Sequence, residues 1–219
     1  MTMADDGVRL GLGVSFGEVL EIDAARYMVR VSLDDMEVDA DSDAGYWCPV
    51  VTPLAGAARG LYLLPDVGDQ VAVAFYNGSL ADGVVIGGVW RGDQKPPESD
   101  EANPRKALVS RSGHRIVLDD TDKAEQIQIV DKTAKNSITI ATTDNIMTLV
   151  VEGTVNIQAK TAINIEVPDG TLTLACKDLG VKASGAVKLE GQSIELASKS
   201  TVKIGGQSVD VNNGALQVK

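Results

Sequence analysis

A single histidine, His114, is the first residue in this chain that could do acid–base or metal chemistry. A protein zinc site uses three or four ligands, and the sequence offers neither a second histidine nor a closely spaced cysteine pair. We therefore expect His114 to be an ordinary residue at the start of a strand. Three copies of His114 could still meet on a symmetry axis, and that alternative stays open.

The segment DADSDAG contains three alternating carboxylates, Asp39, Asp41 and Asp43, and so resembles part of a calcium-binding loop. Such a loop needs glycine where Ala44 stands and glutamate where Val50 stands. The pattern therefore favours a solvated acidic loop that joins two strands over a calcium site.

Other reactive residue types do not form a recognisable catalytic pattern. Asp119 and Asp120 are adjacent, so on a strand they would face opposite sides and could not share a substrate. No nucleophile elbow or phosphate-binding loop is present, and Cys48 and Cys176 are expected to be buried, inert thiols. We predict a protein that is not an enzyme and that uses no cofactor and no metal.

Charge and hydropathy exclude two classes of partner. The chain has 219 residues and a net charge of −11, whereas binding a phosphate backbone needs clustered Lys and Arg, so nucleic acid is not expected. No signal peptide and no apolar run of about 18 residues is visible. We expect synthesis in the bacterial cytoplasm.

Composition divides the chain into two different halves. All eight aromatic residues lie before residue 91, and the segment RGDQKPPESDEANPRK that follows is polar and rich in proline. We predict three parts: 1–92, an OB-fold domain; 93–106, a linker; and 107–219, a needle.

The first part shows the pattern of a small β-barrel. Short alternating segments separated by Gly, Asp and Pro predict five strands, which is the number in an oligonucleotide/oligosaccharide-binding (OB) barrel. The expected strands are 14–23, 26–33, 46–54, 70–76 and 83–90. The expected barrel core is Trp47, Val71, Val73, Phe75 and Trp90.

The second part is a repeat of short strands without aromatic residues. Pairs of aliphatic residues separated by one polar residue recur first every eleven residues and then every seven to nine. Three of these pairs, Leu149/Val151, Leu179/Val181 and Leu216/Val218, continue the same pattern. The residues that we expect to line a common axis are Ile116, Leu118, Ile127, Ile129, Ile138, Ile140, Val155, Ile157, Ile163, Ile165, Leu172, Leu174, Val187, Leu189, Ile194, Leu196, Val202, Ile204, Val209 and Val211.

Such thin strands indicate an assembly of three chains. One chain with rungs of seven or eight residues has too little perimeter to close a β-helix around its own core. Three copies, each supplying one strand per level, could form a prism whose narrow axis is filled by small aliphatic residues. The sequence therefore predicts an all-β homotrimer with an OB barrel followed by a triple-stranded, intertwined β-helix; an ordinary β-sandwich is the alternative.

The barrel sequence also resembles a known family. The stretch 46–97, with Trp47, Arg59-Gly60, Leu64-Pro65 and Val67-Gly68-Asp69, is similar to the OB domain of contractile-tail spikes. That family includes phage baseplate assembly protein V, the phage cell-puncturing device and the VgrG proteins of type VI secretion. The segment SRSGHRIVLDDTDKAEQIQI (110–129) resembles the start of the β-helix in the same family.

The resemblance implies a mechanical function with defined partners. A homotrimeric spike at the centre of a phage tail baseplate, or of a related injection particle, would be driven through the target cell envelope. The chain lacks the family's hub and lysozyme domains and its His-x-His tip, so a separate hub trimer at the OB end and a PAAR-like tip protein are expected. The expected tip contacts are Asn212, Asn213, Leu216 and Val218.

Two other functions stay open at this stage. A surface- or glycan-binding adhesin on a trimeric fibrous stalk would need exposed aromatic residues on its barrel. A cell-wall hydrolase would need an acid/base pair, which the sequence does not offer.

Overall fold

The computed structural model describes residues 13–34, 45–76, 79–97 and 100–209. The acidic loop with Asp39, Asp41 and Asp43, the axis residue Val211 and the tip contacts Asn212, Asn213, Leu216 and Val218 lie outside these ranges. The chain divides into two compact units, Met1–Asn156 and Ile157–Lys219. In the described ranges, none of the helical structure is long and apolar enough to cross a membrane.

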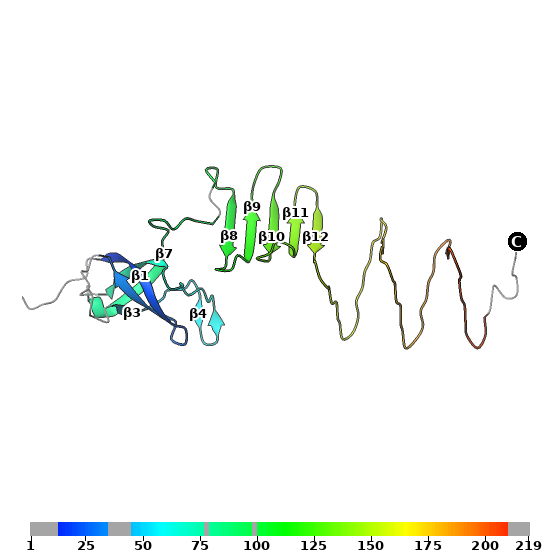
Figure 1. The fold of residues 1–219 in the computed structure, drawn as a ribbon, viewed down its shortest axis with the longest axis horizontal. Coiled ribbons are helices and arrows are strands. Elements are labelled where there is room, and N and C mark those ends of the chain that lie inside the picture. Colours follow the sequence, from blue (N-terminus) through cyan, green and yellow to red (C-terminus); the bar gives the residue numbers. More distant parts are fainter. Residues whose placement is uncertain (1–12, 35–44, 77–78, 98–99, 210–219) are drawn as a thin grey trace, which may run out of the picture. The chain divides into compact units, whose positions relative to one another are not determined.

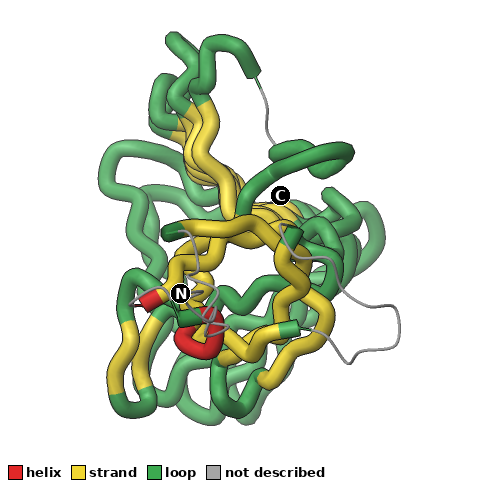
Figure 2. The backbone as a smooth tube through the Cα atoms, turned by 90° about the vertical axis from the view of Figure 1, so that its left-hand side faces the viewer, coloured by secondary structure: helices red, strands yellow, loops and turns green. Residues whose placement is uncertain are grey.

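A five-stranded antiparallel barrel occupies the first part of the chain. Its strands are β1 (Val14–Asp23), β2 (Met28–Leu33), β3 (Tyr46–Pro49), β6 (Gln70–Phe75) and β7 (Gly83–Gly88). They are hydrogen-bonded in the order β3-β2-β1-β6-β7. A parallel bridge between Val50 and Val85, with a hydrogen bond of 2.8 Å from Val51 N to Val85 O, joins the two edges. Figure 2 shows these strands curving around the core.

The barrel core follows from strict alternation along its strands. In β2 the exposure pattern alternates residue by residue, and Val29, Val31 and Leu33 are buried. The strand β1 bends at a register shift between Val19 and Glu21, which lets it contribute to both sides of the barrel. The buried cluster comprises Val19, Val29, Val31, Leu33, Cys48, Val71, Val73, Phe75 and Val85.

Two short elements complete the barrel region. The strands β4 (Ala55–Gly56) and β5 (Arg59–Gly60) form a small hairpin, and η2 (Leu80–Asp82) is a 3-10 turn before β7. The regular secondary structure of the described residues is thus β-strand apart from short 3-10 turns, which agrees with the predicted all-β class.

Several barrel predictions need correction. The second strand begins at Met28 and not at Arg26, because Tyr27 has a φ of 57° and lies in the turn that Asp23 stabilises by accepting from Arg26 N. The third strand ends at Pro49 and does not reach Leu54, and the last strand ends at Gly88 and does not reach Trp90. Trp90 is 64% exposed in the single chain, so its assignment to the barrel core was wrong. Trp47, also predicted in the core, is only half-buried, and the guanidinium carbon of Arg26 lies over its ring, 5.7 Å from the ring centroid.

A second antiparallel sheet follows the barrel in the sequence. It consists of β8 (Arg105–Val109), β9 (Arg115–Asp119), β10 (Gln126–Val130), β11 (Ser137–Ala141) and β12 (Ile146–Val150). The five strands form a simple meander in which each strand pairs with the next, as Figure 1 shows. Every strand has five residues, so the sheet presents a narrow, regular strip.

Residues 151–209 carry no strand in the single chain, although the structure describes all of them. Bends recur at 152–153, 160–161, 168–170, 177, 184–185, 192, 199–200 and 206–207. Between consecutive bends lies a straight segment that holds one predicted aliphatic pair, for example Val155 with Ile157 and Ile194 with Leu196. The periodicity read from the sequence is therefore present, whereas the triple-stranded β-helix and the homotrimer stay predictions.

A candidate assembly face and its polar edges

The register of the second sheet places its large aliphatic residues on one face. Cα partners lie on the same face of an antiparallel sheet, so each matched row can be followed across the strands. One row runs through Leu108, Ile116, Ile129, Ile138 and Leu149. The other runs through Leu118, Ile127, Ile140 and Met147. We call these nine residues the apolar face.

The apolar face is uncovered in the single chain. Eight of its nine side chains are exposed, between 40% for Ile140 and 70% for Met147, and Ile138 is half-buried. Six of the predicted axis residues, from Ile116 to Ile140, are thus brought together on one face. Their position on a trimer axis stays a prediction.

The sequence analysis missed part of this face. Alternation predicted the pair Leu149/Val151, but β12 ends at Val150 and its apolar pair is Met147 with Leu149. Leu108 was missed because β8 was counted partly as linker. Alternation inside IMTLV could have indicated Met147, since Thr148 between the two apolar residues faces the other way.

The opposite face of the sheet mixes polar side chains with smaller apolar ones, such as the buried Val117 and Val130, and it also holds a hydrogen-bonded carboxylate. Asp119 is only 5% exposed and accepts hydrogen bonds from Thr121 Oγ1 at 2.5 Å and Arg105 Nε at 2.8 Å. These bonds, that of Thr121 first, lower the pKa of Asp119 to about 2. Asp120 is exposed, so the two adjacent carboxylates occupy different environments. Asp119 therefore ties the end of β9 to Arg105 of β8 and to the turn that precedes β10.

His114 joins two turns that lie at the same end of the strands, which we call one edge of the sheet. Its ring nitrogen Nδ1 accepts a hydrogen bond of 3.2 Å from the backbone N–H of Lys132, which belongs to the turn between β10 and β11. Its own backbone N–H bonds Ser110 Oγ at 3.1 Å within the turn between β8 and β9. In the parts of the chain that the structure describes, no three His, Cys, Asp or Glu side chains gather into a possible metal site.

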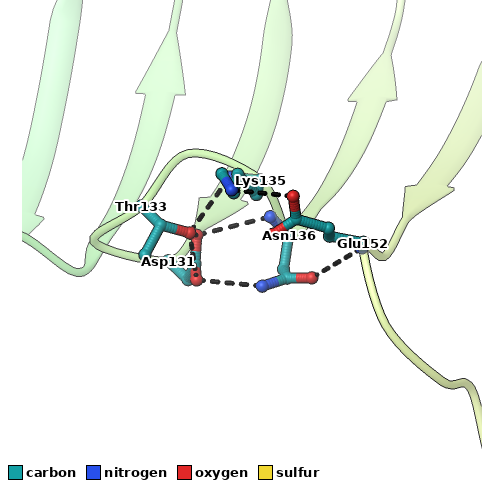
Figure 3. Close-up of polar contacts among 5 residues, drawn as sticks. All are labelled: Asp131, Thr133, Lys135, Asn136 and Glu152. Atoms are coloured by element: carbon teal, nitrogen blue, oxygen red, sulfur yellow. Dashed lines mark hydrogen bonds and ion pairs between the residues drawn. The ribbon is translucent and has the colours of Figure 1, made fainter.

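A polar cluster continues along this edge to the point where the chain leaves the sheet. Asp131 accepts from Thr133 Oγ1 at 2.8 Å and from Asn136 Nδ2 at 3.0 Å. Asn136 Oδ1 in turn accepts from the backbone N–H of Glu152 at 3.0 Å, and Lys135 Nζ lies 2.7 Å from a Glu152 carboxylate oxygen. Figure 3 shows how the five side chains link the turn to the segment after β12.

The hydrogen bonds of this cluster also favour the charged form of its carboxylate. The bond from Asn136, followed by the bond from Thr133, lowers the pKa of Asp131 to about 2, although burial acts in the opposite direction. We call Asp131, Thr133, Asn136 and the Glu152 N–H the exit clamp.

The two cysteines differ in their surroundings. Cys48 is buried in the barrel, as predicted, and burial raises the pKa of its thiol to about 11, which favours the protonated form. Cys176 is exposed in the single chain, so its predicted burial is not found there. It lies in a segment whose neighbours are all exposed too.

Comparison with known proteins identifies the barrel. Residues 16–90 match the family of the type VI secretion system/phage-baseplate injector OB domain. A search of curated proteins found no match. The matched segment contains β2, β3, β6 and β7 and nearly all of β1, so the family match and the observed strand order describe the same domain.

The predicted resemblance to the central spikes of contractile tails is thereby confirmed through this domain. An injector domain of this kind also associates the chain with a phage tail baseplate or a secretion-system assembly. What this comparison shows is that residues 16–90 are similar to the OB domain of type VI secretion and phage-baseplate injectors.

Proposed function

We propose that this chain is the subunit of a homotrimeric spike, which a contractile phage tail or related injection system drives through a target cell envelope. The carrying observation is the apolar face, which the chain builds in register but does not cover. The family of the barrel supports the setting, and the sheet and the following segments support the trimer.

The apolar face is too large and too regular for a free surface. Nine aliphatic side chains form two continuous rows over five strands, whereas soluble monomers rarely expose contiguous apolar patches of more than a few hundred Å². Three such sheets, with these faces turned inward, would form a closed prism in which each copy covers the other two. The narrow five-residue strands suit a slender prism.

The segments after the sheet support the same assembly by a different argument. Residues 151–209 make no backbone–backbone hydrogen bond in the single chain, although the structure describes every one of them. Extended backbone with apolar side chains needs partners for its N–H and C=O groups as well as for its side chains. Strands from two other copies would satisfy both needs, because they carry the same seven- to eight-residue spacing.

The outer surface suits a mechanical role. Polar residues alternate with the aliphatic ones, and Lys188 and Glu190, on either side of Leu189, form an ion pair of 2.6 Å. A charged exterior keeps a spike in water, so penetration would depend on an external force and not on partition into lipid. We propose that the spike acts without catalysis, cofactor or metal.

The proposed partners follow from this position in the particle. A hub trimer would bind the OB end, and a PAAR-like tip protein would bind the far end, which is where Asn212, Asn213, Leu216 and Val218 lie in the sequence. The particle would be a virion tail baseplate or a tail-like injection particle, assembled after synthesis in the bacterial cytoplasm.

A glycan-binding adhesin is the second candidate. Tyr62 is 62% exposed and lies against Tyr27 with 5.1 Å between ring centroids, and aromatic faces of this kind can stack on sugars. Binding of the purified protein to a glycan array, abolished by Tyr62→Ala, would favour the adhesin.

Light scattering on the purified full chain tests the spike directly. We expect the mass of three chains at micromolar concentration, and persistence of that species in SDS without boiling, because interwoven chains unfold slowly. A monomer under native conditions would contradict the proposal. A trimer that binds glycans but does not co-purify with hub proteins would favour the adhesin instead.

A further inference from the structure

We propose that the exit clamp decides where the chain stops pairing with itself and starts pairing with its neighbours. In this inference, which rests on the proposed trimer, Asn136 holds the Glu152 N–H and thereby prevents a sixth strand from folding back onto β12. The free edge of β12 is then left for the segment of a neighbouring copy that begins at Thr154.

The four turns inside the sheet show what a return turn requires here. Each contains one residue in the left-handed region, with φ of 96° at Gly113, 61° at Lys123, 58° at Ala134 and 53° at Asn145. Each also contains a backbone hydrogen bond from residue i+3 to residue i, such as that of 3.0 Å from Ala134 N to Asp131 O. Local turn geometry therefore closes all four hairpins.

The exit after β12 lacks both features although its sequence permits them. Gly153 is the residue best suited to a left-handed conformation, and its added Cβ would meet nothing within 4 Å. Yet Gly153 is not among the residues with positive φ, and no backbone turn bond is found at residues 151–154. Sequence propensity alone does not explain why the meander ends.

The hydrogen bond to Asn136 supplies the missing explanation. The Glu152 N–H is committed to Asn136 Oδ1 at 3.0 Å, and Asn136 is itself fixed by its bonds to Asp131. Figure 3 shows the chain diverging from β12 at Glu152. A return turn at Glu152-Gly153 would have to break this bond and the ion pair with Lys135.

The edge that the clamp leaves open has an obvious occupant. The strand β12 is the terminal strand of the sheet order, so half of its backbone groups face outward without a strand partner. The segment after Thr154 of another copy is extended, unpaired and carries an aliphatic pair, Val155 and Ile157, that can continue the two rows of the apolar face. A second copy of this chain is therefore the partner that we assign to this edge.

Disulfide trapping tests which chain occupies the edge. Thr148 on β12 and Asn156 are both polar-face positions, so Thr148→Cys with Asn156→Cys should crosslink strands that pair there. The pairs of Thr148→Cys with Thr154→Cys and with Gln158→Cys cover the adjacent registers. Cys176→Ser removes the exposed native thiol, and Cys48 is buried. After oxidation, boiled non-reducing gels should show covalent trimers and not an internally crosslinked monomer.

Two variants then remove the clamp in different ways. Asn136→Ala removes the acceptor and leaves the exit sequence untouched, whereas Glu152→Pro removes the donor and places a turn-forming Pro-Gly pair at the exit. We expect the ratio of between-chain to within-chain crosslinks to fall about fivefold in Asn136→Ala, the factor for one lost hydrogen bond. A larger fall is expected in Glu152→Pro.

Matched controls separate the clamp from its surroundings. Glu152→Ala keeps the N–H but loses the ion pair, and Thr143→Ala removes a bond of 2.8 Å to Glu125 on the opposite edge of the sheet. Both should keep the crosslinking ratio of the parent. If Asn136→Ala and Glu152→Pro also keep it, or if the parent trimer yields only within-chain crosslinks, the inference is wrong while the proposed function stands. A parent that is monomeric in light scattering overturns both.

Discussion

The barrel and the sheet that follows it are both five-stranded and antiparallel, yet they treat their apolar side chains in opposite ways. The barrel curls until Val50 meets Val85, and seven of its side chains, including Val29 and Val73, become almost completely inaccessible. The sheet stays open and exposes side chains such as Ile116 and Leu118 on one face. The main physical difference is that the first sheet closes on itself within one chain, whereas the second does not.

The difference can be traced to residues that permit curvature. Gly17 lies so close to β2 that an added Cβ would meet the Ser32 carbonyl inside van der Waals contact, and the register shift at Val19/Glu21 bends β1 further. The described pairings within β8–β12 contain no such shift. A strand meander without bulges does not wrap around its own side chains, and in the proposed trimer the cover for this apolar face would come from the other two copies.

The largest expected effect is the loss of assembly when charge is placed on the proposed axis. Ile194→Asp would bring three carboxylates together in an apolar environment, which costs several kcal/mol, about 5 or more, without compensating partners. Glu195→Lys at the adjacent position should be nearly neutral because that side chain faces water. Trimer yield in light scattering is the measurement, and equal yields for the two variants would show that the faces are assigned wrongly.

A barrel-specific change should have a smaller effect and leave assembly of the needle intact. Gly17→Ala would force β1 away from β2, since its Cβ would contact backbone that cannot move aside, and we expect a loss of about 1–3 kcal/mol in barrel stability. Gly87→Ala is the matched control, because nothing lies within 4 Å of its added Cβ. Denaturant unfolding followed by tryptophan fluorescence reports the barrel, as both tryptophans precede residue 91. Equal midpoints for the two variants would contradict the close approach.

Much of this organisation could be predicted from the sequence, but not all of it. Strict alternation identified the barrel strands and the periodic pairs, because burial on one face leaves a clear record in residue type. It failed at Tyr27, whose positive φ depends on the Asp23–Arg26 turn, and at Trp90, since an aromatic residue beside a strand is not thereby buried. The polarity pattern of the sequence predicts neither a positive φ set by a neighbouring turn nor the exposure of an aromatic residue beside a strand.

The candidate site could be predicted only in part, for a related reason. The apolar residues from Ile116 to Ile140 were identified one by one, but the register that aligns them is set by four turns of similar geometry. The exit clamp was missed altogether. Asp131 and Asn136 are ordinary turn residues in the sequence, and the significance of Asn136 depends on a backbone group sixteen residues away at Glu152.

Acid should weaken the sheet before it affects the barrel core, which contains no carboxylate. The folded-state pKa of Asp119 is about 2, below its ordinary value of 3.8, so its stabilising contribution is present above pH 4 and is lost as pH falls toward 2. Asp119→Asn should therefore flatten the decrease of melting temperature between pH 4 and pH 2, and the exposed Asp120→Asn should not. Melting curves at a series of pH values measure this. A parent and Asp119→Asn variant with the same slope would show that the hydrogen bonds to Thr121 and Arg105 do not contribute.

The smallest effect is expected on the outside of the needle, because charged side chains there are exposed to solvent, as they are on the surface of the barrel. Lys188 and Glu190 form an ion pair of 2.6 Å, but their side chains are 78% and 70% exposed, so solvent screens the attraction and the side chains lose entropy by pairing. Lys188→Ala should change the free energy of unfolding by less than about 0.5 kcal/mol. Val187→Ala next to it should cost much more in the trimer, although both side chains are exposed in the single chain. If the two substitutions are equally mild in the assembled protein, Val187 does not lie on an axis, and the apolar pairs of the needle are not covered by neighbouring copies.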